Sequence, residues 1–252
     1  MQKIVTFFLV LLINLSLQAQ SLLPTKYGIK LGANISNIIA EANDGVKSFD
    51  GSQLFGFNGG FYMEIALNDK WYINPELIYS QKGSSFTYSY VHDYEVNQRD
   101  ERKSSNELKL SYIEINPTIS YKTKQKISIN FGPSISYLLS SEYNILSDES
   151  INLCCSGAEI LEDSYYQEEN LDLGLNIGLS YYLSEDFFID GKVNTGLMSI
   201  GKISKEIYTG SDPDKLNEKI YDLQNIGIIF SIAYLFNTLS YYYIIFLLVF
   251  LL

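Results

Sequence analysis

Apolar and polar residues alternate along residues 127–139, which read ISINFGPSISYLL. The odd positions carry Ile, Phe, Pro, Tyr or Leu, and the even positions carry Ser, Asn or Gly except at Leu138. A period of two predicts a β-strand with two unlike faces. Because the polar face holds small residues and no Lys or Glu, it suits the inside of a narrow closed barrel. The apolar face would then point outward, where lipid tolerates it.

Seven further segments repeat this alternation. They span residues 27–37, 55–67, 71–81, 108–121, 171–182, 187–197 and 223–236. Short connections at 68–70, 122–126 and 184–186 alternate with four long ones. Outer-membrane barrels have an even number of strands, tight periplasmic turns and long external loops. We therefore predict an all-β fold, an eight-stranded antiparallel up-and-down transmembrane β-barrel in the cell outer membrane.

Aromatic residues recur at two depths of this barrel. Those at the predicted periplasmic ends of strands are Tyr27, Trp71, Tyr121, Tyr181, Phe187, Tyr234 and Phe236. Those nearer the external ends are Phe55, Tyr79, Tyr112 and Tyr137. Two such bands are typical of the interfacial girdles of membrane barrels. The alternative is that Tyr and Phe are simply good strand formers.

A soluble periplasmic barrel of the lipocalin type, with a ligand cavity, is the structural alternative. It would turn its apolar face inward and expose a polar face rich in Lys and Glu. Charged residues instead occur singly among the small polar ones. They are Lys30, Glu64, Glu76, Glu114, Asp172, Asp190 and Lys192. We expect these seven to form a polar network inside the barrel, where acids meet lysines and trapped water.

The two ends of the chain differ from the strand region. Lys3, an apolar run over residues 4–13 and the small residue Ala19 predict a signal peptide at 1–20. We expect the barrel domain at 21–236 and an apolar extension of unknown role at 237–252. The extension is too short to span the membrane as a helix. It is either an interfacial anchor or a sequence extended beyond a lost stop codon.

Composition limits the function of this 252-residue chain, which is 46% hydrophobic with 21 Tyr and a net charge of −11. The apolar content excludes disorder, and the negative charge argues against nucleic acid as a partner. The expected partners are outer-membrane lipid, the barrel-assembly machinery and a protein at the external loops. No cofactor is expected.

Three groups of residues are candidates for chemistry, each with a simpler alternative. His92 and Asp93 adjoin in a predicted loop, but neighbours on a strand face opposite ways, so a solvated histidine is the alternative. Cys154 and Cys155 are adjacent, and a bridge between neighbours is strained. Acidic residues gather in the third long loop and could hold Ca²⁺, although the spacing of a calcium loop is missing. They are Asp148, Glu149, Glu159, Glu162, Asp163, Glu168 and Glu169.

Prolines interrupt three predicted strands. Pro75, Pro117 and Pro133 each remove a donor from the hydrogen-bond ladder. We expect β-bulges beside them.

The chain resembles the PorT-like outer-membrane β-barrel domain, a porin-family small barrel of Gram-negative bacteria, over about residues 27–236. The matching motifs are YGIKLGANIS, FGFNGGFYMEIAL, WYINPELIYSQKG, LSYIEINP, INFGPSISYLL, LDLGLNIGLSYYL and NTGLMSIGK. The resemblance implies a membrane barrel without catalytic residues, in a family of which some members are linked to protein secretion or gliding. We expect a non-enzymatic protein with a structural or interaction role. A membrane-embedded enzyme or a narrow channel is the functional alternative.

Cleavage of the signal peptide can be tested directly. Intact mass of the protein extracted from outer membranes should correspond to a chain that begins at Gln20 or just after, because a small residue at Ala19 suits the peptidase. Ala19→Arg should retain the leader. A wild-type mass that includes residues 1–19 would contradict the prediction.

Overall fold

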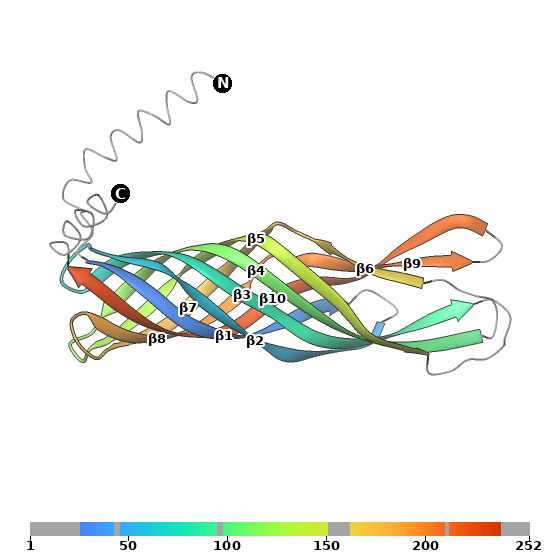
Figure 1. Ribbon diagram of the computed structural model, residues 1–252, viewed down its shortest axis with the longest axis horizontal. Helices are drawn as coiled ribbons and strands as arrows, with labels where there is room; N and C mark the ends of the chain where they lie inside the picture. The colour runs from blue at the N-terminus through green and yellow to red at the C-terminus, as the bar shows by residue number, and fades with distance from the viewer. Residues whose placement is uncertain (1–25, 43–45, 95–97, 151–161, 210–211, 238–252) are drawn as a thin grey trace, which may run out of the picture.

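The computed structural model describes residues 26–42, 46–94, 98–150, 162–209 and 212–237. All ten elements in these ranges are β-strands (Figure 1). They are β1 (Lys26–Ala42), β2 (Val46–Ala66), β3 (Trp71–Tyr94), β4 (Gln98–Lys122), β5 (Ile127–Ser150), β6 (Glu162–Glu168), β7 (Leu171–Tyr182), β8 (Phe187–Gly196), β9 (Gly201–Thr209) and β10 (Asp212–Asn237). No helix in the described ranges is long and apolar enough to cross a membrane. The predicted signal peptide and residues 238–252 lie outside the described residues.

Eight of the strands close into a barrel. Their order is β1-β2-β3-β4-β5-β7-β8-β10, and β10 pairs back onto β1. The closing register runs from Lys26 opposite Asn237 to Ala42 opposite Tyr221. All pairings are antiparallel, so the predicted eight-stranded antiparallel barrel is confirmed. The predicted short connections are tight turns, such as the one in which Leu67 and Asn68 donate to the Trp71 carbonyl.

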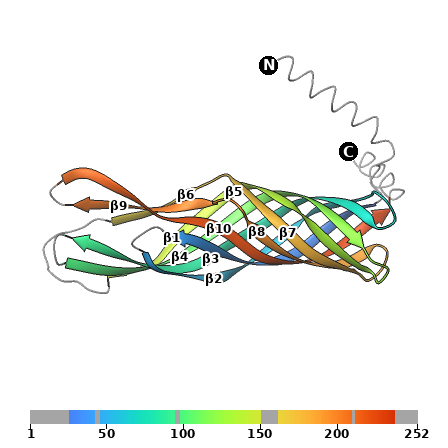
Figure 2. The same cartoon turned by 180° about the vertical axis from the view of Figure 1, so that it is seen from behind.

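The long connections are not loops in the described part of the chain, which corrects our prediction. β3 and β4 pair without interruption as far as Tyr94 opposite Gln98, whereas we expected these strands to end at 81 and begin at 108. β6 and β9 were not expected at all. β9 pairs with the outer part of β10, and β6 pairs with β9. These extensions project as two groups of strands, which we call prongs, at the end opposite the short turns (Figures 1 and 2). One prong consists of the outer parts of β2–β5, and the other consists of β6, β9 and the outer parts of β1 and β10.

The two faces of β3 exchange character where the prongs begin. On β3 the residues facing outward are apolar from Trp71 to Tyr79 and then become Gln81, Ser85 and Thr87. The inward residues change the opposite way, from polar ones to buried Phe86 and Tyr88. An apolar exterior over about nine residues matches the length with which a tilted strand crosses the bilayer. We call this section with an apolar exterior the lipid belt. Beyond the lipid belt the strands surround an apolar core, as strands in water do.

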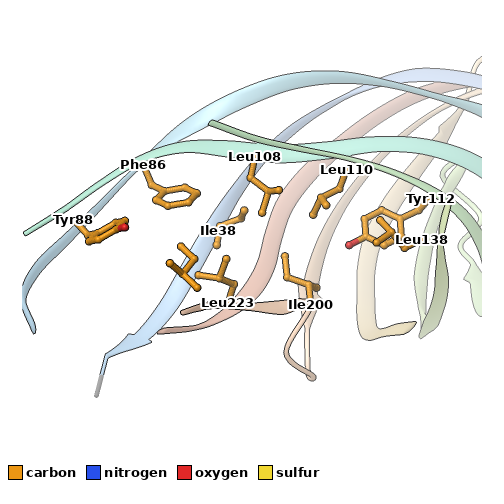
Figure 3. Packing of buried hydrophobic residues seen from close by; sticks show 10 residues of the cluster. Ile38, Phe86, Tyr88, Leu108, Leu110, Tyr112, Leu138, Ile200 and Leu223 are labelled. Carbon is orange, nitrogen blue, oxygen red and sulfur yellow. The ribbon is translucent and has the colours of Figure 1, made fainter. Parts of the chain in front are cut away.

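The core between the prongs is shared by two groups of strands. Pairing between β1 and β2 stops at Ser36 and Leu54, and pairing between β5 and β7 stops at Tyr137 and Leu171. Beyond these points β2–β5 form one sheet, and β1, β10, β9 and β6 form the other. Their buried side chains meet in one cluster (Figure 3): Ile38, Phe86, Tyr88, Leu108, Leu110, Tyr112, Leu138, Ile200, Ile203 and Leu223. Tyr112 therefore points inward and does not belong to the outer aromatic band.

The three strand prolines form one row across β3, β4 and β5. Pro75 pairs with Pro117. The flanking pairs of Ile115 with Ile135 and Ile119 with Phe131 put Pro133 opposite Pro117, with no change of register. A Cβ on Gly132 would lie 2.5 Å from the Pro117 carbonyl oxygen, so only glycine permits this approach. The predicted bulges beside the prolines are wrong, because the strand pairing on both sides of this row runs without a register shift.

The lipid belt predicts that the stability lost on adding a charged residue to the outer face depends on its depth in the membrane. Ile115→Arg on the outer face of β4 should lower the free energy of unfolding by about 2–4 kcal/mol, since Arg is costly near the bilayer midplane. Ser85→Arg, on the outer face of a prong, should change it by less than about 1 kcal/mol. Urea titration in lipid vesicles, followed by the gel shift between boiled and unboiled samples, measures both. Equal costs at the two positions would argue against the belt.

Candidate functional site

Four charged side chains meet at the centre of the barrel. Lys30 Nζ lies 3.0 Å from Glu76 Oε1 and also contacts Asp190 Oδ2. Lys192 Nζ lies 2.6 Å from Glu76 Oε1 and 3.5 Å from Asp190 Oδ2. All four side chains are buried. Two lysines therefore balance two acids, which reduces the cost of holding charge away from water.

Hydroxyl and amide groups from neighbouring strands complete this central group. Ser180 donates to Asp190 Oδ1 at 2.9 Å, and Asn130 donates to the same oxygen at 3.3 Å. Asn130 also donates to Ser180 Oγ at 2.6 Å. These bonds join β5, β7 and β8 across the interior, so the small polar residues of the inner face connect the strands through their side chains.

A second charged group lies nearer the prongs. Lys82 Nζ lies 2.7 Å from Glu114 Oε1 and donates to Asn194 Oδ1 at 3.1 Å. Asn225 donates to Asp172 Oδ2 at 2.9 Å. Lys82 also lies 5.6 Å from the centre of the Tyr112 ring, where the apolar core begins. The Lys82 ammonium thus lies at the junction between the polar and the apolar halves of the interior.

A third group occupies the end with the short turns. Lys122 Nζ lies 2.6 Å from Glu64 Oε2, and Tyr182 donates to the same oxygen at 3.1 Å. The ammonium lies 4.1 Å from the centre of the Tyr72 ring and 4.4 Å from that of Tyr182. Cation–π contact on two sides and a carboxylate on the third fix this lysine across the mouth of the barrel.

The structure places all seven residues of the predicted network inside the barrel as buried groups. It brings Lys30, Glu76, Asp190 and Lys192 together, whereas Glu64, Glu114 and Asp172 have other partners. The prediction missed Lys82 and Lys122, which supply the cations for Glu114 and Glu64. Lys82 occupies an even-numbered position of β3, as the other inward residues of this strand do, so a longer predicted strand would have included it. Lys122 was assigned to a turn.

This arrangement fills the centre of the barrel. The cavity bounded by the central group and the adjoining amides has a volume of about 10 Å³, which is the space of about one water molecule. Above it the apolar cluster occupies the space between the prongs. The site is therefore suited to holding eight strands in a fixed arrangement, since Lys30, Lys82 and Lys192 each pair with a carboxylate of another strand.

The remaining candidate residues lie in the prongs or outside the described residues. His92 and Asp93 belong to β3, opposite Asp100 and Arg99 of β4, so they lie in a strand and not in a loop. Their side chains, and Cys154, Cys155 and Glu159, lie outside the described residues. In the acidic set, Asp148 and Glu149 lie near the end of β5. Glu162, Asp163 and Glu168 belong to β6, and Glu169 follows it. No group of three His, Cys, Asp or Glu side chains that could hold a metal ion occurs in the described part of the chain.

Aromatic contacts connect the two prongs. Tyr143 of β5 stacks on Tyr166 of β6 with ring centres 6.0 Å apart, and Phe86 lies 6.5 Å from Tyr143. Tyr166 donates from its hydroxyl to the Ile200 carbonyl at 2.8 Å. Burial raises the pKa of the Tyr166 phenol well above its usual range, and nearby Glu168 adds to the effect. The phenol therefore stays protonated and remains a donor.

Residues 18–201 match the family described as Outer membrane protein beta-barrel domain, and the chain belongs to this family. It is an outer-membrane β-barrel protein. No curated protein matches the sequence.

Solved structures of small outer-membrane proteins are similar in fold. Neisserial surface protein A is 13% identical, with a TM-score of 0.42 over 82% of this chain and 96% of that one. The attachment invasion locus protein of Yersinia pestis is 11% identical, with a TM-score of 0.35 over 85% and 100%. Outer membrane protein W of E. coli is 9% identical, with a TM-score of 0.33 over 84% and 98%. The family assignment rests on the match to residues 18–201 and not on these values.

The central group predicts a cost for unbalanced charge. Glu76→Gln leaves two lysines against one acid, so the free energy of unfolding should fall by about 3 kcal/mol or more. Adding Lys192→Met restores the balance, and the double variant should be more stable than Glu76→Gln alone. Urea titration in vesicles measures both. A double variant less stable than the single one would show that charge balance is not what these residues supply.

Proposed function

We propose that the protein is a non-enzymatic outer-membrane scaffold whose projecting strands contact a partner protein. The observation that carries this proposal is the apolar core shared by the two prongs. Ile38, Leu108 and Leu223, from three strands, are buried there beyond the end of the lipid belt. A packed core is unnecessary for anchoring in lipid, and it gives the prongs the rigidity that a recognition surface requires.

The orientation of the barrel supports a partner at the cell surface. Outer-membrane barrels turn their tight connections to the periplasm. The turns after Ala66, Lys122 and Tyr182 would then lie in the periplasm, and the prongs would lie outside the cell. The resemblance to PorT-like domains supports a partner that belongs to protein secretion or to other surface machinery. The barrel-assembly machinery would act on the chain before this, during insertion.

The alternatives raised from the sequence differ in what supports them. A soluble lipocalin-like barrel is wrong, because the apolar residues of the closed barrel face outward and the polar ones face inward. An enzyme would require reactive groups, and the buried acids Glu76, Asp190 and Glu114 are each held by a lysine. A channel would require space that the central group and the apolar cluster fill.

A variant with shortened prongs tests the proposal. Asn-Gly turns would replace residues 89–103, 144–165 and 204–220, which keeps the lipid belt, the polar network and most of the apolar core. The variant should still fold, shown by faster migration of the unboiled sample. Delivery of secreted proteins to the cell surface, measured by mass spectrometry of surface-shaved peptides, should fall to the level of cells that lack the protein.

Two results would count against the scaffold. Full surface delivery by the shortened variant would mean that the prongs are not required. Stable conductance of the full-length protein in planar bilayers would favour a channel. As a matched control, His92→Ala and Asp93→Ala should leave delivery unchanged, since a scaffold needs no general base.

A further inference from the structure

Three buried oxygen atoms lie near the outer end of the lipid belt without a hydrogen-bond partner among the described residues. They are Ser136 Oγ, Asp172 Oδ1 and Asn225 Oδ1. Each of the three side chains is at most 2% exposed. A buried polar atom that has no partner lowers stability, and a buried carboxylate lowers it more than a neutral group does. These oxygens therefore call for a ligand that can accept their lone pairs.

The register of the strands brings these side chains to one place. Ser136 of β5 is paired with Asp172 of β7, and on its other side it is paired with Glu114 of β4. All three are buried on the inner face, and paired residues of neighbouring strands have Cβ atoms about 5 Å apart. Asn225 of β10 joins them, because its Nδ2 donates to Asp172 Oδ2 at 2.9 Å. Four strands thus contribute an oxygen-bearing side chain.

The orientation of the Asn225 amide is fixed by its donors. Nδ2 donates to Asp172 Oδ2 and also, at 3.4 Å, to the hydroxyl of Tyr112, which lies at the inner end of the apolar cluster (Figure 3). Exchange of the amide nitrogen and oxygen would put an oxygen against the carboxylate and lose this bond. The amide oxygen is therefore the atom left without a partner.

Gly196 of β8 leaves space beside the carboxylate. β8 pairs with β7 on one side and with β10 on the other. A Cβ at Gly196 would lie 3.4 Å from Asp172 Oδ1 and 3.1 Å from the Asn225 backbone oxygen. Because glycine has no side chain, the position that a Cβ would take beside these residues is free for a small ligand.

The charge of this group indicates the charge of the ligand. Lys82 Nζ lies 2.7 Å from Glu114 Oε1, and the ion pairs of the described residues include none to Asp172. Two acids are therefore balanced by one lysine, since Ser136 and Asn225 are uncharged. An unbalanced charge is costly away from water. A monovalent cation brings the total charge to zero, whereas a divalent cation would leave one positive charge in excess.

The donor atoms suit a hard cation. Carboxylate, amide and hydroxyl oxygens are the ligands of hard metal ions, while thiolates and imidazoles are those of softer ones. A proton on Asp172 would supply the same charge, but it joins only two oxygens. A cation accepts lone pairs from Ser136, Asp172 and Asn225 together.

We propose that Ser136, Asp172 and Asn225, with Glu114 beside them, bind one small monovalent cation such as Na⁺. The pair of Ser136 with Asp172 is followed by the last pair of β5 with β7, Tyr137 with Leu171. Glu114 and Ser136 belong to strands of one prong, and Asn225 belongs to a strand of the other. The cation therefore joins the two prongs at their base. This inference does not depend on the proposed scaffold function, because it concerns how the prongs are held and not what they contact.

Replacement of Na⁺ by N-methylglucamine tests the proposal on the full-length protein in lipid vesicles. The organic cation is too large for the space that one missing side chain leaves. Urea titration at constant ionic strength measures unfolding in each salt, so that screening of surface charge is the same. At Na⁺ concentrations above the dissociation constant, the equilibrium constant for unfolding should fall about tenfold for each tenfold rise in Na⁺, as mass action requires for one site.

Two variants remove the site in different ways. Asp172→Asn removes the charge and keeps the shape, whereas Gly196→Ala keeps both acids and places a methyl group in the space. In each variant the urea midpoint should become the same in Na⁺ and in N-methylglucamine. The matched control is Asp69→Asn, which makes the same change of net charge at an exposed turn and should keep the full dependence on Na⁺.

Four results would overturn the proposal. The wild-type protein would unfold at the same urea concentration in both salts if water alone satisfied these oxygens. Dependence on Na⁺ that survives in both Asp172→Asn and Gly196→Ala would place the cation elsewhere. A midpoint that rises as the pH is lowered and does not respond to Na⁺ would assign a proton to Asp172. A response to micromolar Ca²⁺ in place of Na⁺ would contradict the charge balance.

Discussion

The medium around each long strand changes from lipid to water partway along its length, and the rest of the structure follows from this change. In lipid the outer face must be apolar, and the inner face can then be polar only if its groups find partners in the interior. In water the requirement is reversed. β3 meets both conditions with one continuous backbone, since its pairing with β4 runs without a shift from Trp71 to Tyr94. The residue types exchange faces while the backbone continues unchanged.

The charged groups of the interior are a consequence of the lipid section. An eight-stranded barrel is too narrow for bulk water, so an acid inside it needs a cation from another strand. Glu76, Glu114 and Glu64 each have one, supplied by Lys30 of β1, Lys82 of β3 and Lys122 of β4. Beyond Tyr112 the interior no longer has to be polar, and apolar packing takes over the same role of holding opposite walls together.

The closed barrel could be predicted from the sequence because its signal is local. Alternation over residues 127–139 or 171–182 specifies a strand and its outer face without knowledge of any neighbour. The prongs could not be predicted in the same way. Around Ser84 and Ser85 both faces of β3 carry small polar residues, so the alternation fades where the faces exchange, and the segment resembles a loop. β6 and β9 are short and pair only with each other and with the outer part of β10, which no local pattern records.

The residues of the candidate site were predictable only where their strands were predicted. The seven charged residues occupy the inward, alternate positions of predicted strands and were identified in this way. Lys82 was missed because its predicted strand ended at residue 81, and Lys122 was assigned to a turn. The proline row shows a further limit. Pro75, Pro117 and Pro133 are 42 and 16 residues apart in sequence, and only the register of three strands places them in one line. The sequence shows each proline separately, and the structure shows that the three share one row.

Closure of the barrel and separation of the two prongs have one physical origin. An unpaired strand edge in the bilayer would leave backbone N–H and C=O groups without partners, so β10 must return to β1 over the whole lipid belt. Beyond the belt, water can satisfy the same groups, and β5 and β6 are free to part above Leu138. The membrane therefore restricts free edges to the part of the barrel that meets water. For a protein whose interior is filled, the surface available for binding is set by where pairing is no longer compulsory.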